Sequence, residues 1–378
     1  MYLYCDLSTG KVRLSDIPPT AVDLEITAAG AFKIIEILSD EWGAIDCTDI
    51  TGLGEHLPIK LASSKPRVPL KIILRSAVGE GIHFGGWPYV RAELAKHHSD
   101  NGFLFDDFVE QSFLYSKSKP IYSEPWGGVI HHPPGIPDFV SVADNLTRLF
   151  ALMEWKESLK TCKFLIALSS HLGDYLSGLV NVPVFVLKHP VKTDVPQWDA
   201  NKFANNPDKM LIQAGSYLRN TSGIYQIPKV FLKKADLVGE ASWVQGYRVA
   251  ISSYWRDCRR RSSLSNDVQV LSRLSDDEYE DSLLKNVFFT EYFAVSASNV
   301  VLECIAHGTP LVVNRLPAVE EYLGSKYPLF YSSIGDISEI LTTASIIKAH
   351  EHLQSIPKQP FSVTRFAASV LSIISECV

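Results

Sequence analysis

The sequence predicts an α/β protein in which mainly parallel strands alternate with helices. The first observation is a short apolar run at residues 70–75, followed directly by a glycine-rich turn and a helical stretch at 88–96. The second is that apolar runs and helical stretches keep alternating along the chain, which is typical of a parallel sheet covered by helices. The third is a change of composition at 189–209, where Pro, Asp, Asn, Lys and Trp replace periodic apolar residues. We therefore expect two sets of α/β units joined by a linker.

The first set of units is expected up to residue 187. Pro88 suits the start of its first helix, because proline is tolerated in the first turn of a helix. Residues 1–60 are less regular: 31–38 look helical, but the segment equally fits completion of the first sheet. The further expected elements are strands near 129–130, 164–168 and 183–187 and a helix at 144–160.

The second set begins where an apolar strand at 210–214 runs into Gly215 and a polar loop. The chain is expected to end in an amphipathic helix at 362–377, because Phe366, Val370 and Ile374 fall on one helical face. Between these two segments we expect strands at 268–271, 292–295, 311–313 and 329–331 and helices at 276–285, 299–306, 319–323 and 337–353.

Length, composition and charge exclude several classes of protein. The chain has 378 residues, of which 46% are hydrophobic, so it can form two or three domains of about 150 residues each. Its net charge is -6, so it lacks the overall positive potential with which proteins bind nucleic acid independently of sequence. The six cysteines form no Cys-x-x-Cys pair, and no apolar run approaches the roughly 20 residues of a membrane span. No basic segment followed by an apolar core begins the chain. We expect a reduced, cytoplasmic protein with at most peripheral membrane contact.

The most informative segment is residues 296–314. Ser296, Ala297 and Ser298 are small, so backbone N–H groups can approach an anion there, and the following helix start favours a phosphate. One turn further, Glu303 is placed to accept hydrogen bonds from a ribose diol. The alternative is that Glu303 only caps a surface helix.

This segment resembles the carboxyl-terminal nucleotide-sugar motif of the group 1 glycosyltransferases, the family-4-like enzymes of GT-B architecture with two Rossmann-like domains facing a cleft. The match runs from Leu302-Glu303 through Ala306-His307-Gly308-Thr309-Pro310 into an apolar strand. Residues 270–278 are similar to the loop that flanks the base in that family, together with the helix after it. The resemblance covers residues 205–378 well; over 1–200 it concerns architecture only.

Two positions depart from that family pattern. Retaining members carry a second acid eight residues before the helix Glu, where this chain has Val295, so the stereochemical outcome stays open. The loop after the first strand of the second domain lacks the usual Lys. Arg219 is the best replacement cation, because a planar guanidinium suits phosphate, although an exposed loop Arg is the alternative.

Candidates for the acceptor side lie in the first domain. The glycines near Gly85 and Gly86 allow a close approach to the cleft, although no dinucleotide fingerprint or Walker A lysine is present. His131 and His132 follow a short strand, and a histidine there suits a general base. They are expected to point in different directions, so that at most one faces the cleft, and structural hydrogen bonding is the alternative. Asp106 and Asp107 are rival bases.

Two further features bear on partners and cofactors. Arg256 and Arg259-Arg260-Arg261 form a basic patch that suits anionic lipid or a phosphorylated acceptor, with a solvated helix face as the alternative. No Asp-x-Asp triplet occurs, so we expect no metal or other cofactor, with cations and helix dipoles stabilising the departing diphosphate.

The resemblance implies a metal-independent glycosyltransferase that moves a sugar from a nucleoside-diphosphate sugar to a hydroxyl of a glycan or glycolipid. The alternatives are a sugar-nucleotide epimerase or hydrolase of the same fold and a catalytically silent glycan- or nucleotide-binding subunit. The expected domains are an acceptor domain (1–200), a nucleotide-sugar domain (201–360) and a terminal helix packing back on the first domain (361–378). The expected site comprises His131 or Asp107 as base; Gly215, Ser216, Arg219, Arg273, Leu274, Ser298, Asn299, Val300 and Glu303 on the donor; and Gly85, Gly86 and His132 on the acceptor side.

Overall fold

The computed structural model describes residues 2–6, 11–15, 23–26, 45–46, 59–62, 70–72, 86–258 and 267–377; of the strands before residue 62, of 71–72 and of 255–258 it describes the backbone only. The chain divides into two compact units, Met1–Arg67 and Val68–Val378. The domain expected at 1–200 therefore spans all of the first unit and part of the second. The other expected domain borders stay predictions.

The first unit contains short antiparallel strands. One sheet has the order β1-β2-β4 and a second pairs β3 with β5, so these strands do not complete the parallel sheet of the second unit. The helix expected at 31–38 lies outside the described residues. The strands are β1 (Tyr2–Asp6), β2 (Lys11–Ser15), β3 (Asp23–Ile26), β4 (Ile45–Asp46) and β5 (Ile59–Ala62).

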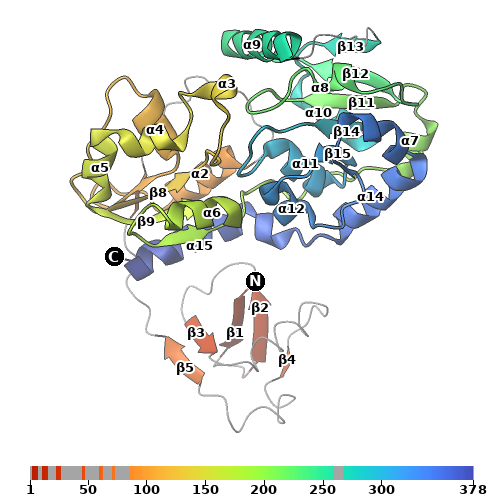
Figure 1. Ribbon diagram of the computed structural model, residues 1–378. Coiled ribbons are helices and arrows are strands. Elements are labelled where there is room, and N and C mark those ends of the chain that lie inside the picture. The colour runs from red at the N-terminus through yellow and green to blue at the C-terminus, as the bar shows by residue number, and fades with distance from the viewer. Residues whose placement is uncertain are drawn as a thin grey trace. The chain divides into compact units, whose positions relative to one another are not determined.

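The second unit is built on two parallel sheets, as Figure 1 shows. The first has five strands in the order β10-β9-β8-β7-β6, and its central strands are apolar and buried on both faces because helices cover it. We call this sheet with helices α2 to α6 the first lobe. Its strands are β6 (Leu70–Ile72), β7 (Phe103–Asp106), β8 (Trp126–Ile130), β9 (Cys162–Ala167) and β10 (Val184–Val186).

The second sheet has six parallel strands in the order β13-β12-β11-β14-β15-β16, and we call it with its helices the second lobe. The strand order reverses between β11 and β14, and open α/β sheets bind ligands outside the carboxyl ends of strands at such a point. The strands are β11 (Met210–Ala214), β12 (Lys233–Leu237), β13 (Val268–Leu271), β14 (Val287–Thr290), β15 (Leu311–Asn314) and β16 (Phe330–Tyr331).

Helices connect and cover the strands, and most begin at residues suited to it. Ser275 caps α10 in a reciprocal capping box with Glu278, and Gly308 ends α11 in the left-handed region. The α-helices are α2 (Trp87–Ala95), α3 (Asp138–Ser141), α4 (Leu146–Ala151), α5 (Met153–Leu159), α6 (Ser170–Ser177), α7 (Ala200–Asn205), α8 (Gly223–Gln226), α9 (Ser242–Cys258), α10 (Asp276–Lys285), α11 (Asn299–His307), α12 (Pro317–Leu323), α13 (Ile337–Ile340), α14 (Thr343–Ser355) and α15 (Val363–Cys377). A short π-helix spans Gln111–Tyr115, and 3-10 turns span Ile334–Asp336 and Gln359–Phe361.

The sequence placed most of these elements, with some errors. The strand expected at 292–295 is wrong: the strand is β14, which is buried throughout and pairs with β11 and β15. The backbone N–H of Tyr292 instead donates to the Asn314 side chain, so this segment is the loop after the strand. The single helix expected at 144–160 is two helices, because the extended backbone of Leu152 interrupts it. The helix expected at 337–353 is likewise interrupted between α13 and α14.

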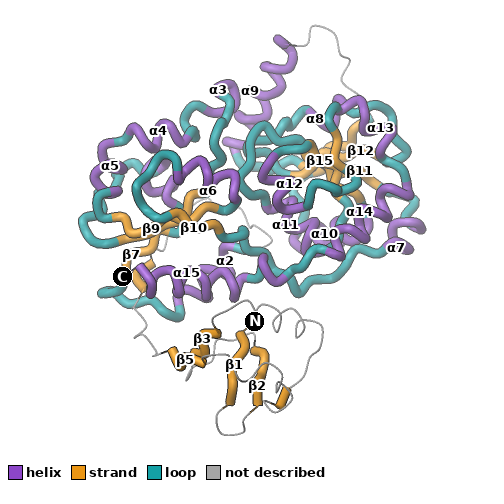
Figure 2. The backbone as a smooth tube through the Cα atoms, turned by 60° about the horizontal axis from the view of Figure 1, so that its bottom comes forward, coloured by secondary structure: helices purple, strands orange, loops and turns teal. Residues whose placement is uncertain are grey.

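The terminal helix α15 packs on the first lobe. Phe366, Val370 and Ile374 belong to the same buried cluster as Leu70 and Phe105 of the first sheet. Figure 2 shows α15 beside α2, the helix with which it has extensive contacts. The chain thus ends by returning from the second lobe to the first.

Contacts of α12 join the two lobes. The carboxylate of Glu321 accepts hydrogen bonds from the Ser170 backbone N–H and forms an ion pair with Lys188. Its neighbour Tyr322 donates its hydroxyl to the Leu168 carbonyl and accepts from the His189 backbone N–H. In the described part of the chain, no helix is both long and apolar enough to span a bilayer.

Candidate functional site

A cavity of about 690 Å³ lies between the two lobes, at the carboxyl ends of both parallel sheets. The loops after β11, β12, β13 and β14 supply its second-lobe wall, and the start of α2 with the ends of β7 and β8 supplies its first-lobe wall. Among the predicted residues it is lined by Asp107, His131, His132, Gly215, Ser216, Arg219, Arg273, Leu274, Ser298, Asn299, Val300 and Glu303. The structure thus brings together side chains that are nearly 200 residues apart in the sequence.

Arg219 lies in the loop after β11, and its backbone is held by two hydrogen bonds. Its N–H donates to the Ser216 carbonyl and its own carbonyl accepts from the Tyr247 hydroxyl. The guanidinium lies 5.2 Å from the Tyr292 ring centre and donates through Nη2 to Ser298 Oγ at 3.0 Å. Its Nε is buried without a hydrogen-bond partner among the described residues. A partly buried cation with an unsatisfied buried nitrogen at a cavity wall is suited to bind an anion.

Gly215 makes room for that guanidinium. Its φ is +78°, a conformation that side chains disfavour, and a Cβ there would lie under 3.0 Å from the Arg219 guanidinium. In the same loop, Leu218 is the described non-glycine residue with positive φ, at 57°, and it is buried. Strained backbone of this kind concentrates at functional sites.

The start of α11 faces the same place. Ser298 is its N-cap residue, yet its side chain makes no capping bond, because it is engaged with Arg219 and with the Tyr292 hydroxyl. The first-turn amide groups are therefore not capped by this serine. Together with the helix dipole and Arg219, these amides are suited to bind a phosphate group.

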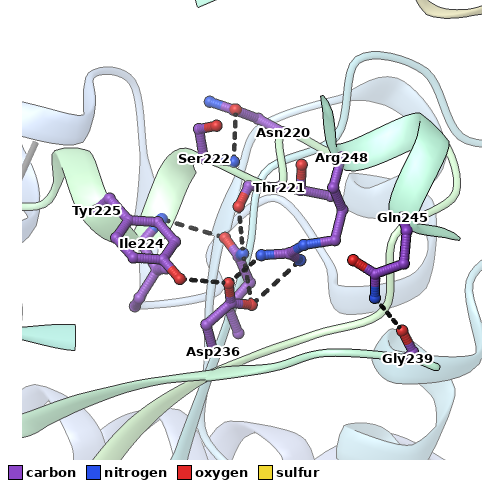
Figure 3. Close-up of polar contacts among 10 residues, drawn as sticks. Asn220, Thr221, Ser222, Ile224, Tyr225, Asp236, Gly239, Gln245 and Arg248 are labelled. Atoms are coloured by element: carbon purple, nitrogen blue, oxygen red, sulfur yellow. Dashed lines mark hydrogen bonds and ion pairs between the residues drawn. The ribbon is translucent and has the colours of Figure 1, made fainter. Parts of the chain in front are cut away.

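A buried polar network joins the loop after β11 to strands β11 and β12 (Figure 3). The side chain of Gln213 donates to the Thr221 carbonyl and to Asp236, and accepts from the Ile224 backbone N–H at 3.1 Å. Asp236 also accepts from the Tyr225 hydroxyl at 2.8 Å and forms an ion pair with Arg248 of α9. Loop, strand and helix are thus joined through one fully buried carboxylate.

Glu303 is buried in the second turn of α11 and points into the cavity wall. It accepts a hydrogen bond from the Tyr279 hydroxyl at 2.7 Å, and burial raises the pKa of the Glu303 carboxyl. The surface-cap alternative for Glu303 is wrong, because the residue is only 4% exposed. A buried carboxyl that lines a cavity is suited to bind hydroxyl groups.

His131 lies on the first-lobe wall, between the rings of Trp87 and Phe108 at centroid distances of 4.7 and 4.4 Å. Its Nε2 donates to the Asp107 carbonyl at 2.8 Å, because a carbonyl only accepts, and Nδ1 then carries the lone pair. Among the described residues Nδ1 has no hydrogen-bond partner. Burial lowers the pKa of His131 to about 3, so the ring is neutral near pH 7.

His132 points elsewhere. Its Nδ1 donates to the Asp144 carbonyl at 2.7 Å, and Nε2 lies within hydrogen-bond distance of the Tyr115 and Tyr217 hydroxyls. Tyr115 donates its hydroxyl proton to the Asp144 carboxylate. Tyr217 belongs to the second lobe, so His132 joins the lobes, while its backbone and that of His131 are held by Glu110.

Asp107 is buried and its carboxylate is paired with Arg91, with 2.5 Å between Arg91 Nε and Oδ2. Of the rival acids, Asp106 accepts from Ser112, Tyr122 and the Phe108 backbone, which is a structural role at the end of β7. Pairing with a guanidinium makes a carboxylate a weaker base. His131 and Asp107 both line the cavity, and His131 offers there the lone pair of its Nδ1.

The remaining predicted positions either do not supply a polar group to the cavity or lie outside the described side chains. Gly86 caps α2 with φ +97°, where a Cβ would overlap the Pro190 carbonyl, and does not line the cavity. Gly85 and Arg259 to Arg261 lie outside the described residues, and the side chain of Arg256 is likewise not described. Val295 is buried at the cavity wall, in the place of the missing acid. No group of three His, Cys, Asp or Glu within the described ranges is arranged to hold a metal; metal independence stays a prediction.

Sequence reasoning missed several cavity residues. Trp87 and Arg91 lie on α2, and Tyr279 and Trp243 lie on α10 and α9. Trp87 directly follows the glycine-rich turn, so its position at a helix start was a usable signal. Trp243 and Tyr279 carried no such signal, because α9 was not predicted and Tyr279 lies within an ordinary polar helix.

Comparisons with known proteins place the fold. The sequence matches no family model, and no curated protein is significantly similar. Among solved structures, the chain superposes on trehalose-6-phosphate synthase OtsA with a TM-score of 0.50 at 12% identity, covering 77% of each chain. Similar values hold for α,α-trehalose 6-phosphate synthase from Burkholderia multivorans (TM-score 0.49, 12% identity, 76% of each chain) and sucrose-phosphate synthase from Thermosynechococcus elongatus (0.46, 14%, 76% of this chain and 73% of that one). At this identity the likeness concerns the fold. The expected architecture is confirmed: the second unit has the fold of the GT-B glycosyltransferases.

Proposed function

We propose that this protein is a glycosyltransferase that moves a sugar from a nucleoside-diphosphate sugar to a hydroxyl of a glycan or glycolipid, without a metal ion. The observation that carries the proposal is Arg219: a partly buried guanidinium, whose buried Nε has no hydrogen-bond partner among the described residues, lies beside the start of α11 and lines a cavity shared with His131. The GT-B fold, shared with a trehalose-6-phosphate synthase, supports it.

The donor is assigned to the second lobe. The diphosphate binds Arg219 and the first-turn amides at Ser298, Asn299 and Val300, beside Gly215 and Ser216. Glu303 accepts hydrogen bonds from the ribose hydroxyls, held in place by Tyr279. The loop with Arg273 and Leu274, which lines the same cavity, flanks the base.

Transfer breaks the bond between the sugar carbon and the diphosphate oxygen and forms one to the acceptor oxygen. The negative charge that develops on the leaving oxygen is stabilised by Arg219 and the α11 amides, which are already oriented before the reaction. The acceptor hydroxyl donates to the lone pair of His131 Nδ1, which takes its proton as the new bond forms. The low pKa of His131 makes it a weak base. The negative charge of a diphosphate bound nearby favours the protonated ring and so raises that pKa.

A second candidate is a nucleotide-binding subunit without turnover, favoured by Val295 at the position of the expected acid. It differs from the first in one observable: it binds nucleotide but transfers no sugar. The location in the cytoplasm and any peripheral membrane contact stay predictions.

The test is calorimetric titration of UDP, GDP, ADP, dTDP and CMP into the wild type and Arg219→Ala, with and without magnesium. We expect one nucleotide to bind without metal and the variant to lose at least tenfold in affinity, since a charge-assisted hydrogen bond contributes about 1.5–3 kcal/mol. A matched control is Arg315→Ala, an exposed arginine paired with Glu320 away from the cavity. No binding of any nucleotide at millimolar concentration would overturn the donor site. Binding without release of nucleoside diphosphate from any sugar donor would favour the silent subunit.

A further inference from the structure

Trp243 is an exposed tryptophan on the wall of the cavity. Its side chain is 57% exposed although tryptophan is a large apolar residue, and it lies in the first turn of α9. The family resemblance assigned no role to α9. An exposed aromatic face beside a cavity with polar groups is typical of a ligand contact.

Trp243, Arg273 and Leu274 line the same cavity and follow two strands that are neighbours in the sheet. Strands β12 and β13 pair in parallel up to Leu237 and Leu271, and the backbone N–H of Val238 continues the ladder to the Leu271 carbonyl. The loops after both strands therefore leave the sheet side by side. One leads to Arg273 and Leu274, and the other leads within a few residues to Trp243.

The backbone of Trp243 is held firmly. Figure 3 shows Arg248, on the same helix, paired with the buried Asp236, and Gln245 donating to the Gly239 carbonyl at 2.8 Å. Helix α9 is thus tied to β12 by an ion pair and to the loop after β12 by a hydrogen bond. A fixed backbone lowers the entropy cost of placing an aromatic face against a ligand.

We infer that Trp243 stacks on the base of the bound nucleoside diphosphate, on the side opposite the loop of Arg273 and Leu274. The inference rests on the proposed function for the presence of a nucleotide. It assigns to this chain a base contact supplied by a helix start rather than by the loop after β13. Every base has a π-face, so the stacking strengthens binding of any nucleotide that enters.

The experiment measures binding of the nucleotide that the wild type prefers to Trp243→Ala and Trp243→Phe. Loss of the indole face is expected to weaken binding by about five- to a hundredfold, the range for removal of one aromatic platform, and phenylalanine is expected to restore most of it. Inorganic pyrophosphate, which has no base, is expected to bind wild type and Trp243→Ala equally. Phe231→Ala removes a comparably exposed aromatic (53%) that does not line the cavity, and should change nothing.

Fluorescence supplies a second readout. Base stacking quenches indole emission, so nucleotide is expected to quench the wild type more than Trp243→Phe; the remaining quenching then belongs to Trp87 and the other tryptophans. Unchanged nucleotide affinity in Trp243→Ala, with Arg219→Ala still defective, would overturn the stacking and leave the proposed function standing. Equal losses for nucleotide and pyrophosphate would also overturn it, because the defect would not concern the base. If no nucleotide binds the wild type, the proposed function fails and the inference fails with it.

Discussion

The Arg219 guanidinium occupies the space where a side chain of residue 215 would lie: a Cβ on Gly215 would be under 3.0 Å from it. The backbone φ of Gly215 is +78°. The glycine is therefore required twice, once for its conformation and once for the space that the cation fills. Because Arg219 also contacts Ser298 at the start of α11, this pair links the loop after β11 to the loop after β14 at the reversal of strand order.

Gly215→Ala is expected to displace Arg219 and weaken nucleotide binding at least tenfold, close to the effect of Arg219→Ala. The protein should stay folded, because the loop lies at the edge of the cavity rather than in the core. Calorimetry with the preferred nucleotide checks affinity, and thermal unfolding checks stability. The control is Gly246→Ala in α9, where a Cβ meets nothing within 4 Å; helix propensity predicts a gain of about 0.5–1 kcal/mol and normal binding. Normal binding by Gly215→Ala would contradict the role assigned to the pair.

Asp236→Asn should destabilise the second lobe by about 3–5 kcal/mol, because it leaves Arg248, only 15% exposed, without its charge partner. Urea unfolding of wild type and variant measures the change. The double variant Asp236→Asn with Arg248→Met is expected to lose less, since no buried charge is then unpaired. A double variant less stable than the single would show that the ion pair is not what holds α9.

Glu303→Ala is expected to weaken binding of the preferred nucleotide by about ten- to a hundredfold, because it removes the hydrogen bonds that the carboxyl accepts from the ribose hydroxyls. Pyrophosphate, which lacks ribose, should bind the variant as it binds the wild type. Glu320→Gln, a partly exposed acid on α12, is the control. Equal losses for both ligands would show that Glu303 supports the start of α11 rather than the ribose.

His131 makes the protein acid-sensitive. Its pKa of about 3 in the folded chain lies below the usual 6.5, so between these values the unfolded chain binds more protons and stability falls as pH falls. Replacing His131 by Gln removes this contribution. Between pH 6.5 and 4 the equilibrium constant for unfolding should then change less with pH, the difference from wild type being at most about tenfold per pH unit. Thermal unfolding of wild type and variant across this range measures it. Identical pH dependence in the two proteins would contradict a buried, neutral His131.

The same substitution separates binding from transfer. Nucleotide affinity should be unchanged in His131→Gln, because the donor lies on the second lobe, while kcat for transfer should fall by about 10²–10⁴-fold, the usual contribution of a general base. Steady-state kinetics with the sugar donor that shows turnover checks it. An unchanged kcat would move the role of base to another group.

The local sequence pattern was sufficient to locate most of the helices and strands. Helix α10 and strand β13 lie where the sequence placed them, because the pattern of apolar and polar residues that marks each is contained in a few neighbouring residues. The small residues at 296–298, Glu303 and Gly308 likewise pointed to a phosphate-binding helix start. Strand β14 was misplaced, since apolar runs at 287–290 and 292–295 are alike until partners in the sheet select one.

Only the tertiary structure decided what these residues do. Glu303 could have capped a surface helix, and its burial against Tyr279 follows from the packing of α11 beside α10. His131 and His132 directly follow β8 and have different surroundings, because different distant elements pack against each: one ring lies between Trp87 and Phe108 and the other meets Tyr217. The spacing of residues in the sequence shows the periodicity of one helix or strand. Whether a side chain is buried, ionised or lines the cavity depends on which distant elements pack against that helix or strand. The sequence therefore determined the α/β pattern and the small-residue start of α11, and the packing of the two lobes determined which side chains line the cavity.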